Sequence, residues 1–169
     1  MQFNLKTLAL RAAAIRLVAI DVDGVLTDGR LYYSDDGEEL KAFHSHDGLG
    51  LRRLIEAGIE PAIISARNSK AVKRRMKELG VTNVHLGCND KGAIVDKLLH
   101  AGGLGRKELA AIGDDLLDLP MLKRAGLAVA VADAHPDLRQ AADWVTKKPG
   151  GRGAVRELCD FILTAQDQK

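Results

Sequence analysis

Aspartates at two distant places along the chain form the first pattern that could do chemistry. Asp21 and Asp23 follow one apolar run, and Asp114 and Asp115 follow another in the same way. Carboxylate oxygens are the ligands that Mg²⁺ prefers, usually one or two of them together with waters and a substrate phosphate. One carboxylate can also attack phosphorus as a nucleophile, while a second gives a proton to the leaving oxygen. The pairs therefore indicate metal-assisted phosphoryl chemistry if the fold brings them together.

A hydroxyl and an amine join these acids. Ser65 ends the apolar run 61–64, and Lys91 opens an amphipathic stretch that continues to His100. A metal ion and a lysine can offset the charge of a transferring phosphoryl group, and positioning does much of the rest. Because carboxylates at close range repel one another, a stable protein is expected to place a cation among them.

Short apolar runs alternate with amphipathic stretches along the chain, a pattern typical of βαβ units and a parallel sheet. We expect strands over 17–20, 61–64, 84–86, 109–112, 127–131 and 144–146. We expect helices over 8–14, 48–57, 70–79 with a cap at Asn68 or Ser69, 91–100, 119–124, 136–142 and 153–165. Right-handed crossovers place the carboxyl ends of parallel strands at one edge, where ligands bind. That edge would collect the acids, the serine and the lysine.

The segment 29–43 interrupts this alternation. Its residues from Leu31 to Phe43 alternate weakly around the turn Ser34-Asp35-Asp36-Gly37, and Asp-Gly between β-prone runs predicts a hairpin. We expect a small flap there, after the first strand.

Length and composition limit the remaining possibilities. With 169 residues the chain is expected to be one domain, 1–169, ending in a tail and helix over 150–169. Lys plus Arg is 25 and Asp plus Glu is 23, too balanced for a nucleic-acid binder. No apolar run approaches the roughly 18 residues of a membrane span, so no membrane partner is expected. The two cysteines do not make a disulfide framework and favour a reducing compartment, so we expect the cytoplasm.

Four motifs in chain order resemble those of the haloacid dehalogenase superfamily. They are DVDGVLTDG at 21–29, Ser65 after a strand, Lys91, and GDDLLD at 113–118. The resemblance implies a three-layer Rossmann-like α/β sandwich with a central parallel sheet. It also implies that Asp21 is the nucleophile and a Mg²⁺ ligand, and that Asp23 is the general acid and base with its backbone carbonyl on the metal. The remaining implied roles are phosphoryl binding by Ser65, charge neutralisation by Lys91, metal ligation by Asp114 and support of the site by Asp115 or Asp118.

The rest of the chain looks like one group within that superfamily, the capless 3-deoxy-D-manno-octulosonate 8-phosphate phosphatases. This likeness rests on AVADAHPD at 130–137, on GGRGAVRELCD at 150–160 and on the lack of room for a cap domain. It implies hydrolysis of an acidic sugar phosphate for lipopolysaccharide synthesis, and a homotetramer in which a neighbouring subunit helps to close each active site. The implied substrate contacts, beyond Asp23 and Lys91, are His44, Ser45, His46, Asp47, Gly48, Arg67, Arg75 and Arg152, the last able to reach a neighbouring site on a mobile tail.

Two departures from that group leave other functions open. His46 stands where the group commonly has arginine, and the second motif reads Ser-Ala-Arg at 65–67 where glycine is usual in the middle. A phosphatase of a nine-carbon acidic sugar 9-phosphate is therefore an alternative. So are a receiver-type phospho-acceptor module and a non-catalytic regulatory domain. The order of the motifs disfavours the receiver-type module, and the filled catalytic positions disfavour the non-catalytic domain.

Overall fold

The structure is a computed structural model, and it describes residues 4–167. Its strands are β1 (Leu17–Ile20), β2 (Tyr32–Tyr33), β3 (Glu39–Leu40), β4 (Glu60–Ser65), β5 (Asn83–Leu86), β6 (Leu109–Gly113), β7 (Leu127–Ala130) and β8 (Trp144–Val145). Its helices are α1 (Leu5–Ala12), α2 (Ser45–Glu56), α3 (Lys70–Leu79), α4 (Lys91–Gly102), α5 (Leu119–Leu122), α6 (Pro136–Ala141) and α7 (Ala154–Asp167). Two short 3₁₀ turns, η1 (Arg106–Glu108) and η2 (Leu116–Asp118), flank β6. The predicted α/β sandwich is confirmed; of the predicted tail, 168–169 lie outside the described residues.

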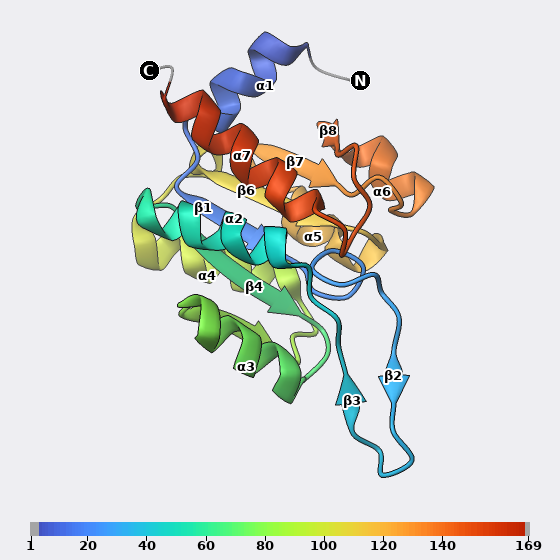
Figure 1. The fold of residues 1–169 in the computed structure, drawn as a ribbon. Coiled ribbons are helices and arrows are strands. Elements are labelled where there is room, and N and C mark those ends of the chain that lie inside the picture. The colour runs from blue at the N-terminus through green and yellow to red at the C-terminus, as the bar shows by residue number, and fades with distance from the viewer. Residues whose placement is uncertain (1–3, 168–169) are drawn as a thin grey trace.

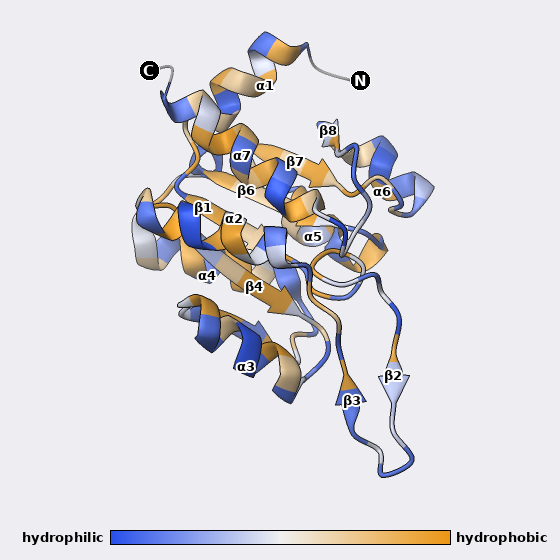
Figure 2. Ribbon diagram, in the orientation of Figure 1, coloured by the Kyte–Doolittle hydropathy of each residue, from blue (hydrophilic) through white to orange (hydrophobic). Residues whose placement is uncertain are grey.

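A six-stranded parallel sheet forms the centre, in the order β5-β4-β1-β6-β7-β8 (Figure 1). All residues of β1, β6 and β7 are buried. A parallel strand covered on both faces must be apolar throughout, which explains why these segments read as continuous apolar runs. Figure 2 shows these three strands mostly in orange, whereas the helices around them mix orange and blue.

Helices cover both faces of the sheet and complete three layers. In Figure 1, α2 and α7 lie together in front of the sheet, and α4 lies behind it. The buried side of α7 carries Val155, Leu158 and Ile162, which join the same apolar core as Leu51 and Leu54 of α2. Packing of α7 on α2 therefore fixes the chain just before α7, next to the edge where the strands end.

The segment between β1 and α2 holds the predicted hairpin. Tyr32 pairs with Leu40 and Tyr33 with Glu39, around a turn in which the Gly37 N–H donates to the carbonyl of Ser34. Gly37 has a φ of 79°, a conformation that glycine adopts without strain. Figure 1 shows the hairpin projecting beyond the sheet. Among residues 4–167, this hairpin is the only β-structure outside the central sheet.

Two helices begin earlier than the apolar periodicity predicts. The periodicity predicts a start near residue 48, but α2 begins at Ser45. The start lies earlier because His44 Nδ1 accepts from the N–H of His46 and because Asp47 places a negative charge in the first turn. Similarly, α1 begins at Leu5 because the Asn4 side chain accepts from the N–H of Thr7. Of the two caps considered for α3, Ser69 takes the role. None of the described helices is both long and apolar enough to span a bilayer.

Candidate active site

A pocket of about 250 Å³ opens at the carboxyl ends of β1, β4 and β6. This is the edge at which open parallel sheets bind ligands. Most of the residues singled out by sequence meet here. The lining consists of Asp21, Asp23, Gly29, Ser65, Ala66, Arg67, Lys91, Asp114, Asp115, Leu117 and Asp118.

A tight turn after β1 lets two aspartates two residues apart face the same pocket. Along a continuing strand, residues i and i+2 would share a face but move apart by about 7 Å. Here the strand stops at Ile20, and the N–H groups of Val25, Leu26 and Thr27 all donate to the carbonyl of Val22. The chain therefore curls around Val22, and both carboxylates line the pocket.

Lys91 joins the first and last motifs through two buried ion pairs. Its Nζ lies 2.7 Å from Asp21 Oδ1 and 2.5 Å from Asp118 Oδ1, and the residue is only 4% exposed. Burial alone favours the neutral amine, but the two carboxylates outweigh it and raise the pKa of Lys91. A charged ammonium is thus fixed against one oxygen of Asp21.

Asp118 orders the loop that follows β6. Its Oδ2 accepts hydrogen bonds from the N–H groups of Asp114, at 2.9 Å, and Asp115, at 3.3 Å. A Cβ on Gly113 would lie 2.4 Å from that of Asp118, which explains the glycine in this motif. The side chain of Asp115 instead accepts from the N–H of Leu116. Asp118 is therefore the residue that positions Asp114.

Three carboxylates converge in the pocket in a way that fits a hard divalent cation. Oxygens of Asp21, Asp114 and Asp118 all lie within 4.8 Å of one another. Burial, with a contribution from the charge of Asp118, raises the pKa of Asp21 to about 6 and that of Asp114 to about 8. Lys91 compensates for only part of this negative charge. A cation with oxygen ligands would relieve the remaining repulsion.

These pKa values predict how metal and pH act on stability. Both lie above the ordinary value of 3.8, so protonation favours the folded state. The stabilising contribution is complete below about pH 4 and is lost as pH rises through 6 and then 8. In the presence of a chelator, we expect the melting temperature to fall as pH rises from about 5 to about 8.5. Mg²⁺ binds the deprotonated carboxylates, so it should raise the melting temperature most at the alkaline end of this range.

Thermal unfolding with chelator and with Mg²⁺ across this range measures the effect. Asp114→Asn should remove most of the Mg²⁺-dependent increase, whereas Asp36→Asn, in the exposed hairpin turn, should leave it unchanged. A Mg²⁺ effect that is independent of pH would contradict the assignment of this cluster.

Gly24, in the first-motif loop, packs directly against Asp114 of the metal cluster. Its φ is 87°, and a Cβ there would lie 2.0 Å from Asp114 Oδ2. Gly24→Ala is therefore expected to displace Asp114 and lower kcat/KM by about 100-fold, the scale of a misplacement of roughly 1 Å. Gly58→Ala, in the turn between α2 and β4, is the matched control, since Gly58 also has a positive φ but nothing near its Cβ. Equal activity of the two variants would show that the close approach is unimportant.

Two cations, Lys41 and Arg67, lie against the carboxylate of Asp23, and the sequence did not predict either contact. Lys41, on the hairpin, forms an ion pair with Asp23 Oδ1, and Arg67 Nε lies 3.8 Å from Oδ2. Arg67 also donates to Glu39 and to the Tyr33 hydroxyl, at 2.7 and 2.8 Å. The sequence held one signal of this network. Glu39 and Lys41 are charged residues two positions apart in the predicted hairpin, a spacing that places both side chains on the same face of a strand.

Arg152 and His44, both predicted to contact substrate, lie beside the main pocket. They line an adjoining pocket of about 340 Å³, together with Asp28, Ala42, Phe43 and Gly151. The tail is docked on its own chain, because the Gly151 N–H donates to the carbonyl of Val25 at 2.9 Å. A Cβ on Gly150 would lie 1.7 Å from the carbonyl oxygen of Gly24, so the tail packs directly on the first-motif loop.

The other predicted contacts lie outside both pockets. Ser45 and His46 are exposed in the first turn of α2. Asp47 is 1% exposed, and its oxygens accept from the N–H groups of Gly153 and Arg156 at 3.2 and 2.7 Å, so it anchors the start of α7. Gly48 is buried where Arg75 of α3 crosses it, and Arg75 Nη1 lies 3.4 Å from Glu78.

Comparisons with known proteins agree with this geometry. A sequence profile described as haloacid dehalogenase-like hydrolase matches residues 89–158. The 3-deoxy-D-manno-octulosonate 8-phosphate phosphatase of Yersinia pestis is 50% identical over 158 residues, which are 94% of this chain and 84% of that protein. The enzyme of the same name from Escherichia coli K12 is 48% identical over 92% of this chain and 83% of its own.

A solved structure extends the likeness to three dimensions. The Moraxella catarrhalis phosphatase of this name, crystallised with a magnesium ion, a phosphate ion and a KDO molecule, superposes with a TM-score of 0.95 at 42% identity. The match covers 98% of this chain and 95% of that one. The chain belongs to the 3-deoxy-D-manno-octulosonate 8-phosphate phosphatase family of the haloacid dehalogenase superfamily. Membership of this family makes it a phosphoric monoester hydrolase.

Proposed function

We propose that the chain is a Mg²⁺-dependent phosphatase that converts 3-deoxy-D-manno-octulosonate 8-phosphate into 3-deoxy-D-manno-octulosonate and inorganic phosphate. The observation that carries this proposal is the Asp21 carboxylate, which lies at the base of the pocket with one oxygen 2.7 Å from the Lys91 ammonium. An anionic nucleophile next to a fixed cation suits attack on a phosphate monoester.

In the first step, an oxygen of Asp21 attacks phosphorus and the bond from phosphorus to the sugar oxygen breaks. Asp23 gives its proton to that leaving oxygen, and the phosphoryl group stays on Asp21 as an acyl phosphate. In the second step, the Asp23 carboxylate takes a proton from a water molecule, whose oxygen attacks phosphorus. The bond between Asp21 and phosphorus then breaks and inorganic phosphate leaves.

The other pocket residues support these two steps. The Ser65 hydroxyl would donate a hydrogen bond to the phosphoryl group, and Lys91 would neutralise the charge of that group. Mg²⁺ would be held by the carboxylates of Asp21 and Asp114 and by the backbone carbonyl of Asp23. When bound, the cation neutralises charge that develops on the transferring oxygens. Asp118, with Asp115, keeps the loop that carries Asp114 in place.

The sugar end of the substrate would lie toward the adjoining pocket. Arg67 lines the main pocket and Arg152 lines the adjoining one, and a guanidinium matches a carboxylate in two-pronged hydrogen bonding. Six further residues complete the proposed substrate region: His44, Ser45, His46, Asp47, Gly48 and Arg75. Of these, Asp47, Gly48 and Arg75 act through the elements that they hold in place. The product is an acidic sugar for lipopolysaccharide synthesis, and we place the reaction in the cytoplasm.

We further propose that the chain works as a homotetramer. The hairpin exposes Leu31, Tyr32, Tyr33 and Leu40. Exposed apolar side chains gathered on one projecting element are typical of an interface. Light scattering should give the mass of four chains, and Leu40→Lys should give a smaller species; a monomeric wild-type protein would contradict the assembly.

Phosphate release from a panel of sugar phosphates, with Mg²⁺ and with chelator, tests the function. The panel contains the eight-carbon 8-phosphate and the nine-carbon acidic sugar 9-phosphates. We expect Mg²⁺-dependent release with the highest kcat/KM for the eight-carbon substrate. A preference for a nine-carbon substrate would keep the chemistry and overturn the substrate, with His46 the first residue to exchange for arginine. Release from no member would overturn the proposed activity.

A further inference from the structure

Lys41 is an unusually buried lysine on an otherwise exposed element. Its side chain is 1% exposed, whereas Tyr33 and Leu40 of the same hairpin are about 60% exposed. Lysine is almost never fully buried unless it is paired. Its Nζ forms an ion pair with Asp23 Oδ1 and lies 3.5 Å from Glu39 Oε1. The hairpin therefore places one ammonium against one specific carboxylate of the active site.

This contact belongs to a network that surrounds Asp23. Arg67 lies 3.8 Å from the other oxygen of Asp23, so each oxygen faces a cation. Glu39 joins the two cations, at 3.5 Å from Lys41 and 2.7 Å from Arg67. Because Lys41 and Glu39 both come from the hairpin, the position of the hairpin determines which partners the Asp23 carboxylate meets.

Lys41 is distinct from the phosphate-binding lysine of the site. It is absent from the lining of the main pocket, where Lys91 is the only lysine among the described residues. The ion-pair partners of its ammonium are Asp23 and Glu39. Of its two partners, Asp23 is the one that takes part in the proposed reaction.

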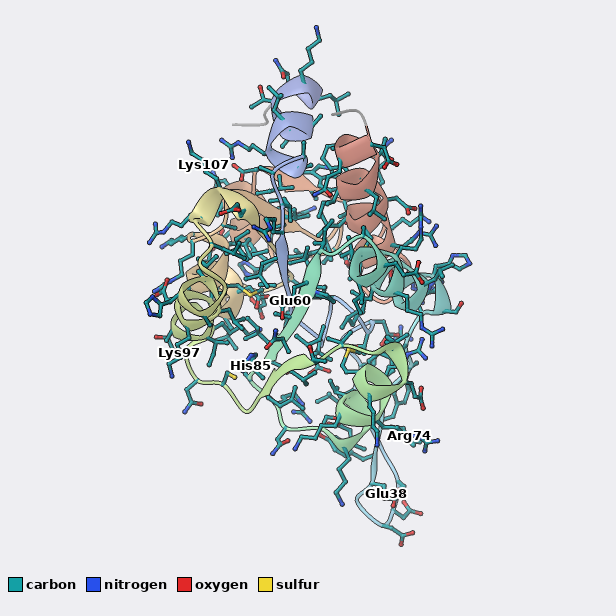
Figure 3. The ribbon with its side chains drawn as sticks, turned by 90° about the vertical axis from the view of Figure 1, so that its left-hand side faces the viewer. Glu38, Glu60, Arg74, His85, Lys97 and Lys107 are labelled. Atoms are coloured by element: carbon teal, nitrogen blue, oxygen red, sulfur yellow. The ribbon has the colours of Figure 1, made fainter. Side chains whose placement is uncertain are left out.

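We infer that Lys41 is a positioning residue that fixes the Asp23 carboxyl group for proton transfer and couples it to the hairpin. The inference rests on the proposed function, in which Asp23 gives a proton to the leaving oxygen. That transfer needs a heavy-atom distance within hydrogen-bond range, and a partner that fixes the carboxyl rotamer maintains it. Figure 3 shows Glu38 at the free end of the hairpin, away from the sheet and beyond Arg74 of α3. A movement at that exposed end would change the geometry of Asp23 through Lys41.

The test compares a leaving group that needs a proton with one that does not. A sugar alkoxide leaves poorly unless it is protonated, whereas p-nitrophenolate leaves unaided. We would measure kcat/KM, which reports steps up to departure of the leaving group, for the wild type, Lys41→Met, Lys41→Arg and the exposed control Lys73→Met. The alkyl substrate is the sugar phosphate that the wild-type protein hydrolyses fastest, and the aryl substrate is p-nitrophenyl phosphate.

For Lys41→Met we expect kcat/KM to fall about 100-fold on the sugar phosphate, the scale of general acid catalysis, and less than about fivefold on the aryl phosphate. Lys41→Arg should recover part of the loss, and Lys73→Met should match the wild type. An equal loss on both substrates, or no loss on either, would overturn the role of Lys41. Failure of the proposed function would give a different result from failure of the role of Lys41, because the wild-type protein itself would then hydrolyse no sugar phosphate.

Discussion

Asp21→Asn should lower kcat by about 10⁴-fold or more, the scale on which the loss of a covalent nucleophile acts. The amide that replaces the carboxylate is a poor nucleophile for phosphorus. The fold should be preserved, because the side chains have nearly the same shape and Lys91 keeps Asp118 as a partner at 2.5 Å. Steady-state phosphate release measures the loss, and circular dichroism checks the fold.

Stability separates this result from unfolding. Burial of Asp21 raises its pKa to about 6, so the charged carboxylate is unfavourable in the metal-free protein near neutral pH. The metal-free variant should be at least as stable as the wild type at about pH 8, because a neutral amide has no such penalty. Asp36→Asn, in the exposed turn, should keep full activity. Near-normal turnover by Asp21→Asn would remove Asp21 as the nucleophile.

Lys91→Met should reduce both stability and activity. The substitution leaves Asp21 and Asp118 buried without their cation, which should lower the free energy of unfolding by about 3–5 kcal/mol. It also removes the fixed positive charge beside the nucleophile, so kcat/KM should fall by about 10²–10³-fold. Urea unfolding and phosphate release measure the two effects.

The double variant Lys91→Met/Asp118→Asn distinguishes these two effects. An asparagine at 118 can still accept from the N–H groups of Asp114 and Asp115, and it removes one of the unpaired charges. The double variant should therefore recover part of the lost stability and none of the lost activity. Recovery of both would mean that Lys91 acts only by holding the structure together.

The sheet, and the edge of it that carries the reactive side chains, could be predicted because each strand is recognisable from its own residues. Parallel strands buried on both faces are continuous apolar runs, and the polar residues that end them must meet at one edge. Asp21, Ser65, Lys91 and Asp114 accordingly line one pocket. The hairpin also followed from local turn chemistry, around Gly37.

Contacts that depend on tertiary packing could not be predicted in this way. Nothing near Lys41 in sequence shows that its ammonium meets Asp23, since the pairing depends on how the hairpin leans on the site. The helix 48–57 was expected from its apolar face, but its start depends on the side chain of His44. Asp47 reads as a polar residue near the substrate, whereas its carboxylate anchors the N-terminal end of α7, more than a hundred residues later.

Trapping the phosphoenzyme tests the central claim most directly. In Asp23→Asn, p-nitrophenyl phosphate can still phosphorylate the nucleophile, because its leaving group needs no proton, but no carboxylate remains at 23 to activate water. We would mix this variant with Mg²⁺ and p-nitrophenyl phosphate, quench the reaction in acid and locate the added phosphoryl group by peptide mass spectrometry. We expect one phosphoryl group on Asp21. A phosphoryl group on any other side chain, or release of nitrophenol with Asp21 unmodified, would contradict it.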